Sequence, residues 1–256
     1  MKFAVFNQKG GVGKTSVACN IAACFAQQGK RTLVVDLDAQ GNASHYLGFD
    51  SDHPEGKTIS DFFQSTIGIN LFGSSLSEFV QSTPISDLFV LPADGRLFEM
   101  QPKLEARYKI FKLRDALNEL TESGKFSQVI LDCPPAMNFY SMSALMAADR
   151  VLIPFDCDAF AVSGLSEVIR VVDDVREDHN PNLQIAGVIV NQWIANAKQS
   201  KSVLERVRAL GIKVFEPFLQ TSVAMRESHD DRLPLVKSKP KHKLTASFMS
   251  LAKEIS

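Results

Sequence analysis

Two lysines stand on either side of a glycine cluster in the stretch NQKGGVGKTS, which covers residues 7–16. Glycines let a backbone approach a ligand without Cβ clashes, and unpaired N–H groups at the start of a following helix attract phosphate. By its position, Lys14 is expected to reach the β- and γ-phosphates of a nucleotide, and Thr15 to coordinate Mg²⁺ through its hydroxyl. The phosphate-binding residues predicted from this loop are Gly10, Gly11, Val12, Gly13, Lys14, Thr15 and Ser16.

Acidic residues end two apolar stretches further along the chain. VVDLDAQGNAS contains Asp36 and Asp38, and QVILDCPPAM contains Asp132 followed by Pro134 and Pro135. Phosphoryl transfer depends mainly on positioning, so a carboxylate near the γ-phosphate must be held by a rigid strand end. The second stretch has the form of a Walker B strand, in which Asp132 would hold Mg²⁺ through a water. The two prolines would stiffen a turn that senses the γ-phosphate.

The glycine loop departs from the usual P-loop pattern, because GxxxxGK[ST] would need glycine where the chain has Gln8. With Lys9, the loop matches KGGxGK[ST], the deviant Walker A form, and so resembles the ParA/MinD family of ATPases. The resemblance implies a slow, partner-stimulated ATPase that uses ATP and Mg²⁺ and forms a nucleotide-sandwich homodimer, in which Lys9 reaches the partner's phosphates. It also implies that Asp38 orients the attacking water and that Asp36 lies beside the Mg²⁺ shell. The predicted catalytic residues are Lys9, Lys14 and Asp38, and the predicted metal residues are Thr15, Asp36 and Asp132.

Further stretches extend this resemblance over residues 2 to about 235. VIVNQW places Asn191 where the family carries an adenine-reading asparagine, and Pro217 follows in VFEPFL. An amide both donates and accepts, so it can distinguish adenine from guanine, although a strand-end asparagine is also a common turn residue. IPFDCDAFAVSGLSEV is similar to a family stretch in which the helix beginning near Ala161 packs at the dimer face. Ala39 replaces a proline common in the family and removes no reactive group.

The elements that must position these residues alternate along the chain. Short β-rich runs are expected to be strands at 2–6, 31–36, 88–93, 128–132, 150–155, 185–191 and 212–216. Helical spacing is found at 15–28, 103–122, 138–147, 161–178 and 199–210. This alternation predicts an α/β P-loop fold with a mostly parallel twisted sheet and helices on both faces. We expect one domain over 1–256, with an irregular surface insertion at about 50–86 and a C-terminal helix at about 242–255.

Composition narrows the function classes. The formal net charge is -1, so no overall positive field attracts nucleic acid and DNA binding would need a local patch. The four cysteines show no CxxC spacing and are expected to be reduced, buried thiols. The start of the chain leaves no room for a signal peptide, and no stretch is long and apolar enough to span a bilayer. A cytoplasmic protein is expected.

The family contains proteins of several functions. Nitrogenase-type iron proteins need interface cysteines, a role that Cys133 does not fit. MinD-like proteins end in a basic amphipathic helix that lies on a membrane. Here the final helix has one narrow apolar stripe with few cations, which favours docking on the protein's own core. The stripe consists of Leu244, Phe248, Leu251 and Ile255.

Larger ParA proteins carry a helix-turn-helix domain before the P-loop, for which this sequence has no residues. The resemblance therefore implies non-specific DNA binding by the ATP-bound dimer, association with the nucleoid, a ParB-like activator, and a role in partitioning DNA or positioning cargo. A membrane-surface ATPase and a regulatory module that holds nucleotide without turnover are the alternatives. The candidate DNA-binding residues are Lys198, Lys201, Arg206, Arg208, Arg226, Lys237, Lys239, Lys241 and Lys243.

Overall fold

A computed structural model describes residues 1–49, 56–67, 75–158, 161–194 and 198–256. Within these ranges, eight strands form one sheet in the order β3-β4-β2-β5-β1-β6-β7-β8. All neighbouring pairs are parallel except the edge pair of β3 and β4. The predicted fold class, α/β with a mostly parallel sheet, is confirmed. The strands are β1 (Lys2–Val5), β2 (Thr32–Asp36), β3 (Gln81–Ser82), β4 (Leu88–Leu91), β5 (Gln128–Asp132), β6 (Arg150–Phe155), β7 (Gln184–Val190) and β8 (Val214–Phe215).

Side-chain alternation along the strands explains why both faces of the sheet are covered. In β2, Leu33 and Val35 join one buried apolar cluster, whereas Val34 joins the other. In β1, Ala4 joins the first cluster and Phe3 the second. Successive residues of a strand point to opposite faces, so a strand that is apolar throughout must have helices above and below it.

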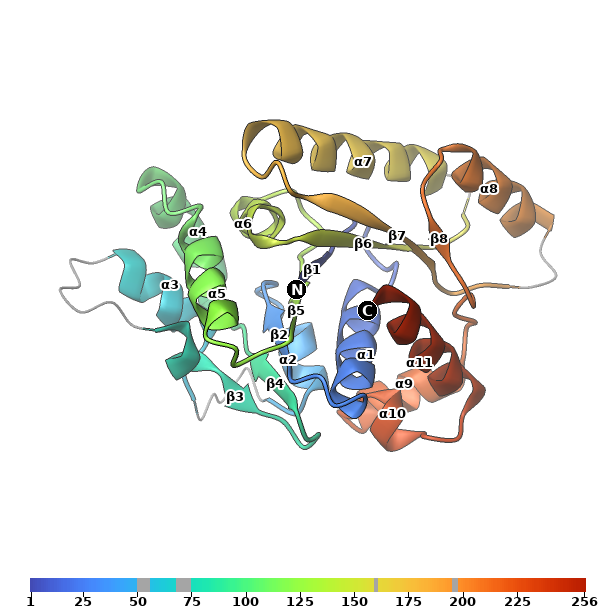
Figure 1. Ribbon diagram of the computed structural model, residues 1–256, viewed down its shortest axis with the longest axis horizontal. Coiled ribbons are helices and arrows are strands. Elements are labelled where there is room, and N and C mark those ends of the chain that lie inside the picture. The colour runs from blue at the N-terminus through green and yellow to red at the C-terminus, as the bar shows by residue number, and fades with distance from the viewer. Residues whose placement is uncertain (50–55, 68–74, 159–160, 195–197) are drawn as a thin grey trace.

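One face of the sheet is covered by the first long helix and the last part of the chain (Figure 1). The first helix is buried over most of its length, and its run of alanines lets it lie close to the strands. Burial of its larger apolar side chains contributes roughly 1.5–3 kcal/mol each. The helices on this face are α1 (Lys14–Gln27), α2 (Asn42–Tyr46), α9 (Val223–Asp230), α10 (Leu235–Ser238) and α11 (Lys243–Ile255).

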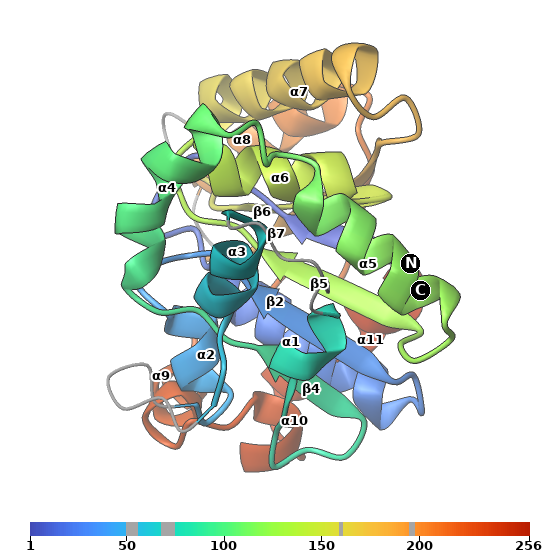
Figure 2. The same cartoon turned by 90° about the vertical axis from the view of Figure 1, so that its left-hand side faces the viewer.

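The opposite face carries the helices from the middle of the chain (Figures 1 and 2). Helix α7 has the predicted bounds, and α6 and α8 differ from prediction by one residue at most at either end. The helices are α3 (Ile59–Ile67), α4 (Arg96–Ala106), α5 (Lys112–Glu122), α6 (Phe139–Ala147), α7 (Ala161–Asp178) and α8 (Lys198–Ala209).

Two expectations about this face were wrong. The single helix expected at 103–122 is two helices, α4 and α5, and Tyr108 between them has a φ of 53°, which a continuing right-handed helix does not allow. The stretch expected as a surface insertion at 50–86 contains α3 and the 3₁₀ helix η1 (Leu76–Phe79). Ile59 and Phe63 of α3 are buried in the core because that helix packs beside α4. Residues 50–55 and 68–74 of this stretch lie outside the described residues.

The C-terminal helix docks on its own core, as predicted. The apolar stripe of α11 is buried, and the helix packs along α1. An apolar face already covered by α1 is not available to lie in a membrane surface. Among the described residues, we find no helix with the length and apolar character needed to cross a bilayer.

The four cysteines are free thiols, as predicted. Cys19, Cys24 and Cys133 are buried, whereas Cys157 is only half-buried. Burial raises the pKa of Cys24 to about 12 and that of Cys157 to about 11. These thiols are therefore protonated near neutral pH, where they pack as small apolar groups.

Candidate nucleotide-binding site

The glycine loop follows β1, at the topological switch point of the sheet, where later strands are added on the opposite side of β1. Strand β1 lies between β5 and β6, and the strands connected to it extend to both sides. Ligands of open α/β sheets bind beyond the carboxyl ends of the strands at such a point. Strands β2 and β5 end at the same edge, where Asp36 and Asp132 are paired neighbours. The topology thus brings the loop and two predicted carboxylates together.

The loop has the conformation that its glycines permit. Gly11 and Gly13 have φ values of 79° and 86°, which side chains other than glycine rarely adopt. Lys14 begins α1, is 8% exposed, and donates from Nζ to the carbonyl oxygen of Lys9 at 2.9 Å. Burial lowers the pKa of Lys14, although Asp132, Cys133 and Asp38 oppose the shift. The amine is thus folded back over its own loop, where a bound phosphate chain would meet it.

Thr15 and Asp132 form the second part of the site. The Thr15 hydroxyl donates to Asp132 Oδ2 at 2.7 Å, while Asp132 Oδ1 is buried without a hydrogen-bond partner. Burial, reinforced by the charge of Asp36, raises the pKa of Asp132. An unpartnered buried carboxylate oxygen beside a threonine hydroxyl fits a hard cation such as Mg²⁺, which prefers oxygen ligands.

Asp36 and Asp38 have different surroundings, although both follow β2. Asp36 is fully buried and its oxygens accept from Asp38 N and from both N and Oγ of Ser44. Burial raises the pKa of Asp36 to about 6. Asp36 therefore holds the loop between β2 and α2, and its role beside Mg²⁺ stays a prediction. Asp38 is half-buried and lines the cavity beside the glycine loop, with one carboxylate oxygen accepting from Gln40 N.

A cavity of about 320 Å³ brings together Lys14, Thr15 and Asp38, whereas Asp36 and Asp132 are buried behind its lining. It lies at the start of α1, so backbone N–H groups and the Lys14 amine supply positive potential. Its lining residues are Gly10, Gly11, Gly13, Lys14, Thr15, Ser16, Asp38, Asn42, His45, Cys133, Pro135 and His229.

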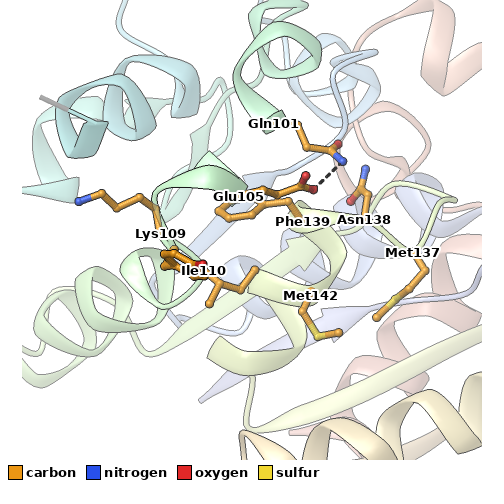
Figure 3. Close-up of a pocket in the computed structure, with 9 residues that line it drawn as sticks. Gln101, Glu105, Lys109, Ile110, Met137, Asn138, Phe139 and Met142 are labelled. Atoms are coloured by element: carbon orange, nitrogen blue, oxygen red, sulfur yellow. Dashed lines mark hydrogen bonds between the residues drawn. The ribbon is translucent and has the colours of Figure 1, made fainter. Parts of the chain in front are cut away.

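A larger hollow of about 430 Å³ lies nearby, between the end of α4 and the start of α6. Figure 3 shows Met137, Phe139 and Met142 along it, while the Lys109 amine points away from them. Glu105 within it accepts a hydrogen bond from Gln101 at 2.9 Å. A mostly apolar lining with a carboxylate does not suit a polyphosphate, so the glycine-loop cavity is the better phosphate site.

Lys9 is engaged within its own chain. Its amine donates to both oxygens of Asp156, at 2.8 Å and 2.7 Å, and also pairs with Asp158. These two hydrogen-bonded carboxylates raise the pKa of Lys9, outweighing the effect of burial. Both acids follow β6, the strand beside β1, so the topology explains the contact. The cross-subunit role of Lys9 stays a prediction.

A second cavity of about 290 Å³ adjoins the loop on the side of β7. Asn191 Nδ2 donates to Val12 O at 2.9 Å, and a Cβ on Gly13 would collide with that amide. The lining includes Asn191 but takes Gln220, Thr221 and Ser222 from the segment after β8, whereas Pro217 is exposed a few residues earlier. Asn191 thus lines this cavity, and its adenine-reading role stays a prediction. That of Pro217 stays a prediction without a cavity contact.

The candidate DNA-binding residues fall into two groups, because α8 lies on one face of the sheet and α9 to α11 lie on the other. Arg208 pairs with Glu216 at 2.7 Å and Lys239 with Glu227 at 2.9 Å. Arg226 lines the cavity that contains Asn191, which places it beside the nucleotide site. The Lys198 side chain lies outside the described residues. The remaining candidates, Lys201, Arg206, Lys237, Lys241 and Lys243, are exposed.

Several side chains of the site were not predicted from the sequence. Asp156 and Asp158 had a usable signal, since acids directly after an apolar strand lie at the carboxyl edge of a parallel sheet. Asn42 and His45, which also line the cavity, lie in α2, a few residues after the predicted Asp38. His229 had no such signal, because it is 213 residues from Ser16, whose hydroxyl it contacts.

The switch-point loop, the Thr15 to Asp132 contact and the doubly covered parallel sheet define a P-loop nucleotide-binding protein. A protein-family model described as an AAA domain matches residues 1–185. The chain is 33% identical over 255 residues to the chromosome partitioning protein ParA of Caulobacter vibrioides, covering 98% of this chain and 92% of that protein. It is 30% identical over 257 residues to the sporulation initiation inhibitor protein Soj of Bacillus subtilis, covering 98% and 96%.

A solved structure supports the same grouping. Cobyrinic acid a,c-diamide synthase from Mycobacterium smegmatis, with a bound ATP analog and magnesium, has a TM-score of 0.84 at 28% identity, covering 98% of this chain and 92% of that one. Nucleotide and Mg²⁺ thus bind within this fold. The chain belongs to the ParA/Soj family of P-loop ATPases, in the ParA/MinD superfamily.

Proposed function

We propose that this chain is an ATP-dependent, dimerising switch ATPase for partitioning DNA or positioning cargo over the nucleoid. The observation that carries the proposal is the convergence of Lys14, Thr15 and Asp38 on one cavity at the start of α1. The partitioning role is drawn from similarity to proteins named ParA and Soj.

Lys14 and the backbone N–H groups of the loop bind the phosphate chain and hold it in place. The Thr15 hydroxyl and the Asp132 carboxylate would hold Mg²⁺, which neutralises charge on the phosphate oxygens when it is bound. The free Oδ1 of Asp132 supports this assignment.

Asp38 orients the water that attacks the γ-phosphate. Its carboxylate stands just beyond the end of β2, and the loop that carries it is tied down by the buried Asp36. One Asp38 oxygen already accepts from Gln40 N, so water orientation by this group depends on the loop's exact conformation. Turnover is therefore slow until an activating partner of the ParB type sets that conformation.

Dimerisation uses Lys9. With ATP bound, each Lys9 leaves Asp156 and Asp158 and reaches the phosphates held by the partner subunit. Its side chain is 35% exposed, and the two carboxylates are 23% and 43% exposed, so water can replace the lysine at this pair. Because ion pairs this exposed are worth only about 1 kcal/mol or less, a triphosphate competes well for the amine.

DNA binding belongs to the ATP-bound dimer and uses phosphate contacts from the exposed basic residues of α8 and the α9 to α11 region. One subunit presents these residues on two faces, so the dimer is needed to form a continuous surface. Non-specific binding of this kind weakens steeply with salt.

Retention of the protein on bulk double-stranded DNA tests the proposal, measured with ATP, with ADP and without nucleotide. We expect retention with ATP alone, falling steeply as salt is raised, together with a shift from monomer to dimer in sedimentation under the same conditions. Equal retention in all three conditions would contradict the nucleotide switch. Binding of nucleotide without phosphate release would instead leave a regulatory module.

A further inference from the structure

Ser16 lies where the two cavities of the site meet. It lines the cavity that contains Lys14 and Asp38, and it also lines the one that contains Asn191. If the proposed function is right, the first cavity holds the β- and γ-phosphates and the second holds the base. The group of the nucleotide beside Ser16 is then the α-phosphate, which connects the two.

Helix α9 supplies side chains to both of these cavities. Arg226 lines the base-side cavity, and His229, one turn later, lines the phosphate-side cavity. Residues three apart lie on the same face of a helix, so one face of α9 covers the junction from the far end of the chain. Its first residues follow Ser222, which caps the helix and lines the base-side cavity.

His229 is fixed in place on two sides. Its Nε2 lies 2.9 Å from Ser16 Oγ, and its ring stacks on Tyr46 with 3.9 Å between centroids and 7° between planes. The Tyr46 hydroxyl is in turn bonded to Ser228 and to Asn20 inside the core. The imidazole therefore has little freedom to rotate away from Ser16.

The surroundings of His229 favour the neutral form of its imidazole ring. His229 is half-buried, and burial lowers its pKa. The neighbouring His45 acts in the same direction, and Asp230 opposes it. A neutral imidazole carries one N–H, on either Nε2 or Nδ1.

The direction of this hydrogen bond decides what Ser16 can do. A serine hydroxyl has a single hydrogen and can accept on its oxygen at the same time. If His229 donates from Nε2, the Ser16 hydrogen remains free for a phosphate oxygen. If Ser16 donates to His229, that hydrogen is used and a phosphate beside it loses a donor.

We propose that His229 is a positioning residue that donates to Ser16 Oγ and so directs the Ser16 hydroxyl at the α-phosphate of the bound nucleotide. It acts through Ser16 and does not touch the reacting γ-phosphate. This inference rests on the proposed nucleotide site and adds a residue that contributes equally to ATP and ADP binding, since both carry the α-phosphate.

The test measures the dissociation constants of ADP and of a non-hydrolysable ATP analogue by calorimetry, with Mg²⁺ present. His229→Phe keeps a ring against Tyr46 and removes the donor, and we expect both nucleotides to bind about tenfold more weakly, which corresponds to about 1.4 kcal/mol. His229→Gln places an amide N–H near the position of Nε2, and affinity should return to within about threefold of the starting protein. His179→Phe, on an exposed histidine elsewhere, is the matched control and should change neither constant.

A double-mutant comparison isolates the pair. Ser16→Ala should weaken both nucleotides about as much as His229→Phe does, and the double variant should be no weaker than Ser16→Ala alone. Additive losses would mean that His229 acts independently of Ser16 and would overturn the proposal. So would a loss confined to the ATP analogue, because that would place His229 at the γ-phosphate.

A readout without nucleotide keeps the proposal testable if a variant folds poorly. Nitrogen NMR of the unmodified protein should find the His229 proton on Nε2, and a proton on Nδ1 would overturn the proposal. Thermal unfolding of each variant separates a loss of fold from a loss of affinity. If the unmodified protein binds neither nucleotide, the proposed function fails, and that result is distinct from failure of the His229 role.

Discussion

The two ends of the glycine loop differ in whether a single chain already places their lysine for ligand binding. At the Lys14 end, the amine is buried and the Thr15 hydroxyl already contacts Asp132. At the Lys9 end, the amine is partly exposed and held by Asp156 and Asp158. The first end needs only a ligand to be finished, whereas the second must give up existing ion pairs before it can act elsewhere. In the proposed mechanism, nucleotide binding and dimer formation are therefore separable steps.

The Lys14 end should be the most sensitive to mutation. Lys14→Ala removes the only lysine of the described cavity lining, and we expect nucleotide binding to fall about a thousandfold, because several charge-assisted hydrogen bonds are lost together. Calorimetry with ADP and an ATP analogue measures the effect. Lys103→Ala, at an exposed position of α4, is the control. Near-normal affinity in Lys14→Ala would place the phosphates in another cavity.

Substitution of Asp38 should slow ATP hydrolysis without weakening ATP binding. We expect Asp38→Ala to bind ATP with nearly unchanged affinity and to release phosphate about a hundredfold more slowly, since it lacks the carboxylate that orients water. The protein should then accumulate as the ATP-bound dimer. Steady-state phosphate release and sedimentation measure the two effects, and turnover at the normal rate would assign the water to another group.

Lys9→Ala should separate the two ends of the loop. Nucleotide affinity of the monomer should stay within about threefold, while ATP-dependent dimerisation weakens at least about tenfold, because the cross-subunit phosphate contact is lost. Sedimentation at several protein concentrations measures the dimer. If Lys9→Ala dimerises like the unmodified protein, the ion pairs of Lys9 are only part of the folded monomer.

The smallest effect is expected from the carboxylates that hold Lys9. Replacing Asp156 and Asp158 together by asparagine should favour the ATP-bound dimer about fivefold, because neither Lys9 of the dimer has to leave partly exposed ion pairs worth about 0.5 kcal/mol per subunit. The gain should shrink as salt is raised. Asp173→Asn, which breaks an exposed ion pair with Arg176 on α7, is the matched control. A weaker dimer in the double variant would show that the acids support the interface.

Local patterns predicted the parts of the molecule that neighbouring residues determine. The glycine loop, the strand before it and the helix after it follow from residues within one short stretch, and the strand ends at Asp36 and Asp132 follow from apolar runs. The buried stripe of α11 was equally clear from its spacing. In each case, the bounds of the predicted and observed elements agree to within one residue at either end.

The parts that were missed depend on contacts between distant segments. The carboxylates around Lys9 come from the neighbouring strand β6, a neighbour that only the strand order reveals. His229 reaches Ser16 because α9 lies beside the start of α1, and the hydrophobic pattern of the sequence does not predict such a contact between distant helices. Arg226 looked like one more surface cation, but its helix turns it toward the site. Tyr108 broke an apparently continuous helix through a single backbone angle.

Gly13 must meet two requirements: its backbone is left-handed, and the amide of Asn191, directly after β7, lies where a side chain would be. The glycine loop and the end of β7 are consequently in direct contact. If Asn191 reads the base as predicted, a purine that fits poorly against it would displace the turn whose backbone N–H groups hold the phosphates. In that case, a poorly fitting base would weaken phosphate binding directly, and no further residue would be needed to connect the two ends of the nucleotide.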